Sequence, residues 1–474
     1  MNTQLAAVLS SPSKRDRAAL DGLLAELKEV LGERCVTSAA VREQHAHTLT
    51  WIANQPPDAV VFPLSTDEVS AIVKLCAEAR IPIIPFGAGT SLEGHVNAPH
   101  GGICLDMSRM KRIVAVNDED LNVVVEAGVT RKELNSHLRD MGLFFPIDPG
   151  ADASIGGMAS TRASGTNAVL YGTMKDNVLA ITAVMPNGTV VKTAQPVKKT
   201  SAGYDLTRLL VGAEGTLGII TELTLKLYGI PETIMAAICS FPTARSACDA
   251  TIYTIQSGLS VARIEFLDAV QVKAVNAYSK LTLPESPLLL LEFHGSEAGV
   301  REQIEAFRII AQQCGGDRFE GAEKPEDRTR LWQARHDVHW ASQTLRPGAR
   351  ITWTDVCVPI SRLAECMDET RLDMEASGLI GPIVGHVGDG NFHTGLLIMV
   401  DDPDEIANAE RYLERLAERA IRMNGTCTGE HGIGQGKIRY LEAELGADTV
   451  EVMRVIKRAI DPDNVMNPGK IFRL

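Results

Sequence analysis

Two short glycine-flanked segments in the C-terminal half bring together side chains that suit metal chemistry. Residues 385–393 read GHVGDGNFH, and residues 426–434 read TCTGEHGIG. Imidazole and carboxylate groups suit Zn²⁺, Mn²⁺ or Fe²⁺, and two histidines with one carboxylate leave coordination positions open for a substrate. A single histidine is more often a hydrogen-bonded core residue, but clustering in two such turns favours a divalent metal site. Gly429 and Gly432 give the backbone the freedom that Glu430 and His431 need to face one site.

Three glycine-rich segments in the N-terminal half indicate a second kind of chemistry. They read PFGAGTSLEG at 85–94, DPGADASIGGMAS at 148–160 and VGAEGTLGIIT at 211–221. Glycine lets the backbone turn sharply and brings N–H groups against an anion, while Thr and Ser hydroxyls add donors. The first segment matches neither a Walker loop nor the Rossmann fingerprint, and alone it fits a structural turn equally well. Three such segments together favour a chain wrapped around an extended phosphate-containing cofactor.

The same three segments resemble the FAD-binding domain of the vanillyl-alcohol-oxidase-type flavoenzymes. In that family the first loop holds the pyrophosphate, and the later segments line the adenosine and isoalloxazine. Family members with covalent flavin often carry a histidine at the position of Thr90, so the resemblance implies non-covalent FAD. The FAD-contacting residues that it implies are Pro85, Gly87, Ala88, Gly89, Thr90, Ser91, Gly94, Pro149, Gly150, Ala151, Asp152, Ser154, Gly156, Gly157, Ala159, Ser160, Gly165, Tyr171, Gly172, Glu214, Gly218, Ile219, Ile220 and Asn467.

The C-terminal half resembles the FAD-linked D-2-hydroxy-acid dehydrogenases, most closely those of the cytochrome-type D-lactate dehydrogenase group. The similarity includes LWQARH at 331–336 and TDVCVPISRL at 354–363, and it covers about residues 55–474. It implies His386, His393 and Glu430 as ligands of Zn²⁺ or Mn²⁺, and His431 as the catalytic base. It also implies that Arg335 anchors the substrate carboxylate, although from the residues alone a helix-surface ion pair with Glu326 or Asp327 is the alternative.

The expected reaction is oxidation of a D-2-hydroxy acid, with D-lactate to pyruvate as the best candidate. The metal would polarise the hydroxyl, His431 would take its proton, and the hydride would pass to flavin N5. Relatives that act on D-2-hydroxyglutarate carry a lysine where Trp353 stands, so a short or apolar substrate side chain is favoured. The alternatives are a glycolate oxidase flavin subunit and a D-2-hydroxyglutarate dehydrogenase. From other classes, a metal-dependent hydrolase and a non-catalytic flavin-binding protein stay open.

The elements that must position these residues follow an α+β pattern. We expect an N-terminal helical segment at 1–54, an FAD-binding domain of two α/β subdomains at 55–231, and a substrate or cap domain at 232–425. A C-terminal segment at 426–474 would complete the active site. The cap domain should contain an antiparallel sheet flanked by helices on one side. The more specific predictions are a helix over Arg17–Leu31, a capping box at Thr130 and Glu133, a hairpin turning at 186–188, and one helix over Pro325–Leu345.

Composition limits partners and location. The net charge of -13 argues against nucleic acid, and no apolar run approaches the length of a membrane span. Nothing near Met1–Leu9 has the pattern of a signal peptide. Nine scattered cysteines without a C-x-x-C pair predict reduced thiols and a cytoplasmic location, with attachment to the inner face of the membrane left open. No haem-attachment motif occurs, so a separate cytochrome, quinone or electron-transfer flavoprotein would accept the electrons; a homodimer is also left open.

Overall fold

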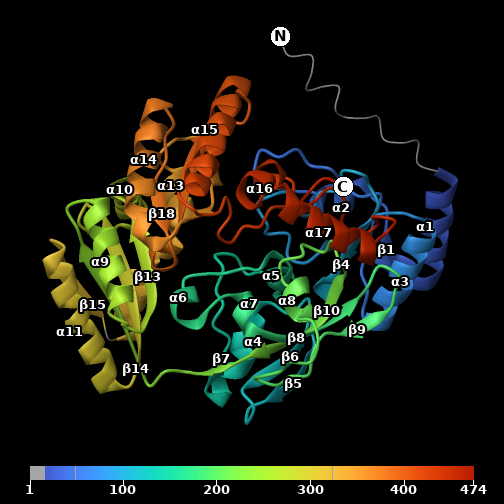
Figure 1. The fold of residues 1–474 in the computed structure, drawn as a ribbon, viewed down its shortest axis with the longest axis horizontal. Coiled ribbons are helices and arrows are strands. Elements are labelled where there is room, and N and C mark those ends of the chain that lie inside the picture. The colour runs from blue at the N-terminus through green and yellow to red at the C-terminus, as the bar shows by residue number, and fades with distance from the viewer. Residues whose placement is uncertain (1–16, 49, 323) are drawn as a thin grey trace.

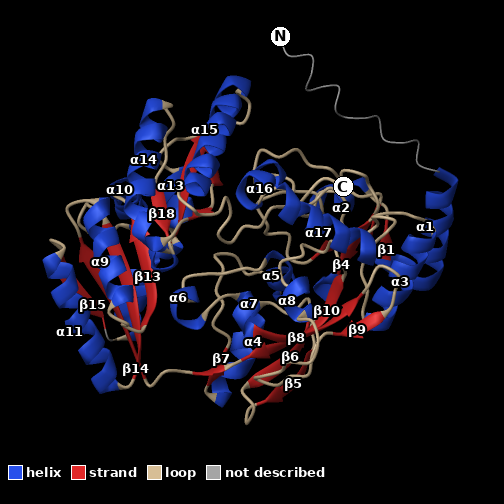
Figure 2. Ribbon diagram, in the orientation of Figure 1, coloured by secondary structure: helices blue, strands red, loops and turns tan. Residues whose placement is uncertain are grey.

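The computed structural model describes residues 17–48, 50–322 and 324–474, and these form two lobes (Figure 1). The first lobe contains most of the chain up to residue 229 together with the last helices, and the second lobe contains the large sheet that follows. Helices and sheets are mixed within both lobes, which confirms the predicted α+β class (Figure 2). Within the described residues, no helix is both long enough and apolar enough to cross a membrane.

The first lobe is built on two sheets. One is four-stranded in the order β1-β2-β4-β3, with β4 parallel to both β2 and β3, and the other is five-stranded and antiparallel in the order β5-β6-β10-β8-β9. The strands are β1 (Cys35–Val36), β2 (Ala59–Val61), β3 (Ile83–Phe86), β4 (Ile103–Asp106), β5 (Ile113–Asn117), β6 (Asn122–Glu126), β8 (Val178–Val184), β9 (Val190–Lys192) and β10 (Ile219–Lys226), with a separate pair β7 (Leu143–Phe144) and β11 (Tyr228–Gly229).

The helices of the first lobe bear out several local predictions. The helix that apolar spacing predicts over Arg17–Leu31 is α1. Its Leu23, Leu27 and Leu31 are buried in the core, and Leu20 and Leu24 pack against it while partly buried. The capping box at Thr130 and Glu133 opens the helix α4. The other helices of this lobe are α2 (Ala39–Gln44), α3 (Thr66–Glu78), α4 (Arg131–Leu138), α5 (Ile155–Thr161), α6 (Ala168–Tyr171), α7 (Met174–Asn177) and α8 (Leu206–Leu210).

The second lobe is built on an eight-stranded sheet in the order β15-β12-β14-β13-β18-β19-β16, with β17 paired to β19. Every pairing in this sheet is antiparallel, as expected for the cap domain. Its strands are β12 (Thr233–Ser240), β13 (Val261–Leu267), β14 (Leu288–Gly295), β15 (Asp317–Ala322), β16 (Arg350–Trp353), β17 (Val356–Cys357), β18 (Ile383–Gly385) and β19 (Asn391–Ile398).

Helices cover both faces of this sheet, so the expectation that they lie on one side was wrong. Side chains such as Ile264 and Phe266 pack with α9 (Ala244–Gln256), α11 (Glu297–Gln313), α14 (Leu363–Ala376) and α15 (Pro403–Arg422). Alternate residues of the same strands, such as Leu267 and Leu290, point the other way. They pack with α10 (Ala269–Ser279), α12 (Pro325–His336) and α13 (Val338–Gln343).

The single helix expected over Pro325–Leu345 is also wrong, because it is divided at Asp337 into α12 and α13. At this break Asp337 has φ -87° and ψ 0°, and its carboxylate accepts a hydrogen bond from Ser279 of α10 at 2.5 Å. Arg335 therefore stands in the last turn of α12 rather than within a longer helix.

The C-terminal segment returns from the second lobe to the first (Figure 1). Its helices are α16 (Ile438–Leu445) and α17 (Ala447–Ile460). Met466 forms a bridge with Ile83 of β3, and the Lys457 ammonium donates to the carbonyl oxygen of Thr216 at 2.7 Å. The chain just before α16, which carries Glu430 and His431, therefore crosses from one lobe to the other. The predicted domain boundaries themselves stay predictions.

Candidate active site between the two lobes

The two histidine-containing segments meet at one point. His386 directly follows β18, His393 lies in β19, and Glu430 comes from the loop before α16. Glu430 Oε1 lies 3.2 Å from His386 Nε2 and 3.4 Å from His393 Nε2. One potential ligand atom from each residue lies within 4.8 Å of the other two, and both histidines are buried. Among the described residues this is the group of histidine, cysteine and acidic side chains whose spacing fits a metal ion.

Hydrogen bonds on the far side of each ring set the direction of the free nitrogen. His386 Nδ1 donates to Glu265 Oε1 at 2.6 Å, and His393 Nδ1 donates to the carbonyl oxygen of Thr354 at 2.8 Å. A ring that donates from Nδ1 presents its Nε2 lone pair to a metal, and such partners are typical around metal-binding histidines. The donor set of two imidazoles and one carboxylate therefore fits a divalent ion such as Zn²⁺ or Mn²⁺.

The charges of the cluster also suit a cation. Burial lowers the pKa of His386, but the carboxylates of Glu265 and Glu430 outweigh it and hold that pKa well above its usual range. Burial raises the pKa of Glu430, and the neighbouring histidines reverse this, so its pKa lies well below the usual value. The pocket thus stabilises a positive charge at the point where the three side chains meet, which a divalent cation would supply.

His431 lies beside the cluster without joining it. Its ring stacks on that of His393, with centroids 5.3 Å apart and planes within 9° of parallel. Its Nδ1 is buried and has no hydrogen-bond partner among the described residues. Burial lowers the pKa of His431 to about 4, so the imidazole is neutral at pH 7. A buried neutral imidazole with a free nitrogen can accept a proton from a bound ligand.

Asp355 fixes the loop that carries Glu430 and His431. Its Oδ2 accepts hydrogen bonds from the backbone N–H groups of both residues, each at 2.9 Å. Its Oδ1 accepts one from the Asn391 side chain at 2.8 Å. Although burial opposes ionisation, attraction to the protonated form of His431 and to Lys437 holds the pKa of Asp355 well below its usual range. No role was predicted for Asp355, although it lies in the TDVCVPISRL segment at 354–363, which carries part of the family resemblance.

Glu214 holds the same loop from the other lobe. Its carboxylate accepts from the backbone N–H groups of Ile433 at 2.7 Å and Gly434 at 2.8 Å. His95 Nε2 lies 3.3 Å from the same carboxylate. Glu214 was predicted to contact the cofactor, and that contact stays a prediction. The structure adds a role that the sequence did not reveal, because this side chain ties the third glycine-rich segment to the proposed catalytic loop.

Arg335 points toward the cluster from α12. Its Nε donates to Glu265 Oε2 at 2.8 Å, and neither Glu326 nor Asp327 is its partner. Its two terminal nitrogens make no hydrogen bond to the described part of the chain. The two terminal nitrogens of the guanidinium are thus available to bind a carboxylate ligand near His386, His393 and Glu430.

The three glycine-rich segments lie against one another. A Cβ on Gly87 would lie 2.2 Å from Ser154 Oγ, so the first segment packs tightly on the second. The third segment joins them through the Glu214 N–H, which donates to the carbonyl oxygen of Ser160 at 2.9 Å. Asn467 from the C-terminal segment donates to the carbonyl oxygen of Glu214 at 2.7 Å. Ser91 Oγ is buried without a partner within the described residues, as expected of a group that binds a ligand.

Tyr171 lies where the two lobes meet. Its hydroxyl group lies 2.7 Å from His294 Nδ1 of β14, and it packs edge-on against the ring of Tyr228. This residue was expected to contact FAD, and the observed contacts place it on the side of the glycine-rich segments that faces the second lobe.

Trp353 occupies the same sheet face as His393. In the antiparallel pair of β16 and β19, Trp353 lies opposite Gly395, two residues along from His393, and side chains two apart share a face. Its indole N–H donates to His339 Nδ1 at 3.0 Å. An apolar ring therefore stands on this face of the sheet.

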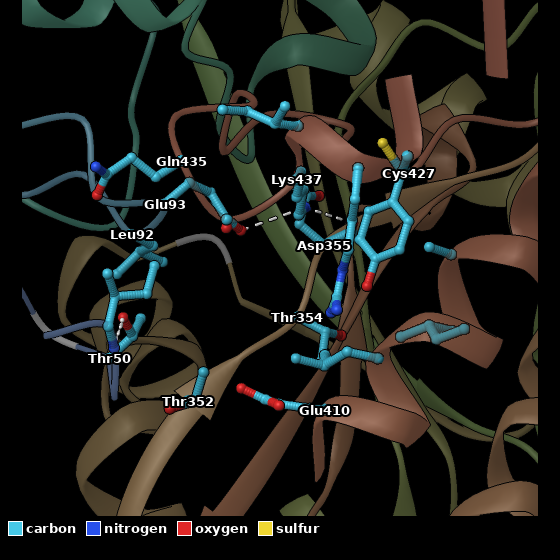
Figure 3. Close-up of a pocket in the computed structure, with 18 of the residues that line it drawn as sticks. Thr50, Leu92, Glu93, Thr352, Thr354, Asp355, Glu410, Cys427, Gln435 and Lys437 are labelled. Carbon is cyan, nitrogen blue, oxygen red and sulfur yellow. Dashed lines mark hydrogen bonds and ion pairs between the residues drawn. The ribbon is translucent and has the colours of Figure 1, made fainter. Parts of the chain in front are cut away.

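A cavity of about 490 Å³ lies beside β16 (Figure 3). Its lining includes both Thr352 and Trp353 of β16, and it includes none of His386, His393 and Glu430. Lys437 also lines the cavity, and its Nζ lies 3.4 Å from the Glu93 carboxylate and 2.9 Å from the carbonyl oxygen of Asp355. Lys437 therefore links the first glycine-rich segment to Asp355, which fixes the loop that carries Glu430 and His431.

Two family models match this chain. Residues 57–194 match the family model described as FAD binding domain, and residues 230–471 match FAD linked oxidases, C-terminal domain. A probable mitochondrial D-lactate dehydrogenase of Danio rerio is 51% identical over 96% of this chain and 93% of that protein. The mitochondrial D-lactate dehydrogenase [cytochrome] of Arabidopsis thaliana is 47% identical over 95% and 80%.

Solved structures support the fold alone. A 4-ethylphenol oxidase from Gulosibacter chungangensis superposes with a TM-score of 0.80 and 18% identity, over 97% of this chain and 98% of that one.

The cytoplasmic location predicted from the cysteines was wrong, since the relatives with about half of their residues identical are named as mitochondrial proteins. All nine cysteines are free, as expected. Free thiols, however, report only the lack of a disulfide framework and do not distinguish one compartment from another.

Proposed function

Because the chain belongs to the family of FAD-linked oxidases, we propose that it oxidises D-lactate to pyruvate with a divalent metal beside a non-covalently bound FAD. The observation that carries this proposal is the meeting of two imidazole nitrogens and a carboxylate directly beside His431, whose Nδ1 has no partner among the described residues. The names of the relatives support D-lactate as the substrate and a separate cytochrome-type protein as the electron acceptor.

In this proposal, different side chains hold the metal, bind the substrate carboxylate and accept the hydroxyl proton. FAD, when bound, would supply the hydride acceptor for the substrate Cα, and the metal would supply positive charge at the substrate hydroxyl oxygen. His386, His393 and Glu430 would hold the metal. Arg335 binds the substrate carboxylate through its two terminal nitrogens. His431 accepts the hydroxyl proton at its free nitrogen, and Asp355 keeps that residue and Glu430 in place through their backbone N–H groups.

The substrate panel is the direct test of this proposal. We expect turnover with D-lactate and D-2-hydroxybutyrate in the presence of an artificial electron acceptor, and much weaker turnover with D-2-hydroxyglutarate. The reason is that Trp353 offers no charge to a distal carboxylate. Glycolate is included because a glycolate oxidase flavin subunit is the rival with the same chemistry. A clear preference of the purified chain for the dicarboxylate or for glycolate would contradict D-lactate as the substrate.

The pH dependence of flavin reduction follows from His431. Burial, together with the charges of His393 and Lys437, lowers its pKa to about 4, although Asp355 and Glu430 oppose this. A base with a lowered pKa keeps its reactive neutral form to lower pH, and a bound cation would act in the same direction. At saturating D-lactate, the stopped-flow rate of flavin reduction should therefore stay level from about pH 8.5 down to about pH 5.5. An acid limb centred near the ordinary histidine value of about 6.5 would contradict this assignment.

A further inference from the structure

A buried glutamate links two parts of the proposed site that come from different elements. Glu265 lies in the middle of β13, and it is 0% exposed. Its Oε1 accepts from His386 Nδ1 at 2.6 Å, and its Oε2 accepts from Arg335 Nε at 2.8 Å. A charge in the interior of a sheet is costly unless it is paired and hydrogen-bonded. Here both oxygens of one carboxylate serve the proposed active site.

The sheet delivers Glu265 to this position by alternation. Its neighbours Ile264 and Phe266 point into the core beneath α9 and α11, so Glu265 points to the opposite face, toward α12. Phe266 pairs with Gly385, the residue before His386, which brings the two side chains together across adjacent strands. The contact with Arg335 spans 70 residues of sequence and joins the sheet to α12.

We infer that Glu265 is a positioning residue that sets the ring of His386 for the metal and the guanidinium fork of Arg335 for the substrate carboxylate. This inference rests on the function proposed above. By accepting the Nδ1 proton, Glu265 leaves the Nε2 lone pair of His386 directed at Glu430. By accepting from Nε, it uses one edge of the guanidinium and leaves the two terminal nitrogens as a two-pronged donor for a carboxylate.

Glu265→Gln tests the inference because an amide has one acceptor oxygen and one donor nitrogen. If the amide oxygen faces Arg335, the NH₂ group faces His386 Nδ1. That ring must then carry its proton on Nε2, where the proton blocks metal binding. If the oxygen faces His386, the NH₂ group opposes the Arg335 N–H and displaces the guanidinium. Neither orientation satisfies both partners, so at least one of the two functions must be lost.

Two measurements on the purified, FAD-loaded full chain separate these results. Retention of Zn²⁺ or Mn²⁺ in competition with a chelator should fall by about 10- to 100-fold in the first orientation, as for other partners of metal-binding histidines. The KM for D-lactate should rise by about 10-fold or more in the second orientation, because a charge-assisted contact is lost. Either change supports the inference. A variant that keeps both values within about twofold of an active, metal-containing wild type would overturn it.

Asp268→Asn is the matched control, since it removes another buried carboxylate just beyond the end of β13. Asp268 pairs with Arg371 and caps α10, and it touches neither His386 nor Arg335. This variant should lower the Tm while metal retention and KM stay at the wild-type values, as expected for a purely structural acid. Failure of the proposed function itself would be seen in the wild type, as the lack of metal or of turnover with D-lactate.

Glu265→Asp keeps the inference testable if Glu265→Gln does not fold. It retains the charge and both acceptor oxygens but withdraws them by one methylene group, so it cannot reach both partners at the observed distances. We expect a smaller rise in KM or loss of metal retention in the same assays, of about threefold or more. Wild-type values of both quantities in this variant would overturn the inference.

Discussion

Replacing His431 with asparagine should lower the rate of flavin reduction by D-lactate by about 10²-fold or more, as expected for loss of a general base. Asparagine keeps a polar side chain of similar length, but it cannot accept a proton at neutral pH. The backbone N–H of residue 431 would still donate to Asp355, so the loop should keep its position. The measurement is anaerobic stopped-flow bleaching of the flavin absorbance near ~450 nm, which isolates this half-reaction from the electron acceptor.

The matched control is His137→Asn on the exposed side of α4, which should reduce flavin at the wild-type rate. Both variants should retain FAD, because His431 is not among the residues expected to contact it. Near-wild-type flavin reduction in the His431 variant would show that another group takes the proton. A non-catalytic flavin-binding protein would instead show no flavin reduction by D-lactate, either in the wild type or in the variant.

Elements defined by neighbours in sequence were predictable. The helix over Arg17–Leu31 ends where its leucine spacing ends, and the capping box at Thr130 forms between residues three apart. The hairpin that turns at 186–188 joins β8 to β9 as expected. Each of these features depends on contacts within a few residues, which periodicity and turn residues report directly.

Features decided by distant contacts were not predictable. Apolar residues recur through 325–345, but the helix is interrupted at Asp337, where the carboxylate binds Ser279 of the distant helix α10. Periodicity likewise shows that a helix has an apolar face, but it does not show which face of the sheet that helix covers. The sequence pattern thus predicted helices on one face of the sheet, whereas the helices of the second lobe cover both faces.

The same division applies to the site. Residue types and spacing singled out the two glycine-flanked segments, and the family resemblance implied His386, His393 and Glu430 within them. The fold brings these three together. No pattern among neighbouring residues identifies which side chains orient these three. Asp355 acts on the N–H of Glu430 from 75 positions away, Glu265 acts on His386 from 121 positions away, and Glu214 acts on the catalytic loop from 219 positions away. A buried carboxylate on a strand or loop gives no sign of its partners until the strands are ordered.

Removing the metal should abolish turnover while leaving the flavin in place. We expect dialysis against a chelator to lower kcat with D-lactate by about 10²-fold or more, because polarisation of the hydroxyl contributes several kcal/mol. Zn²⁺ or Mn²⁺ added back should restore it. The FAD should remain bound, since the glycine-rich segments expected to hold it are distinct from the three metal-type side chains. Metal content, flavin absorbance and kcat are measured on the same samples.

His393→Ala separates loss of the ion from other effects of the chelator. The variant lacks one ligand, so added metal should restore little of its activity, whereas the chelated wild type should recover. Its FAD content should equal that of the wild type.

Full activity in metal-free wild type would contradict the metal site. The three side chains would then act as a hydrogen-bonded group in which the proton shared by His386 and Glu430 supplies the positive charge. In that case His393→Ala should keep most of the activity, because His386 and Glu430 alone would hold that proton.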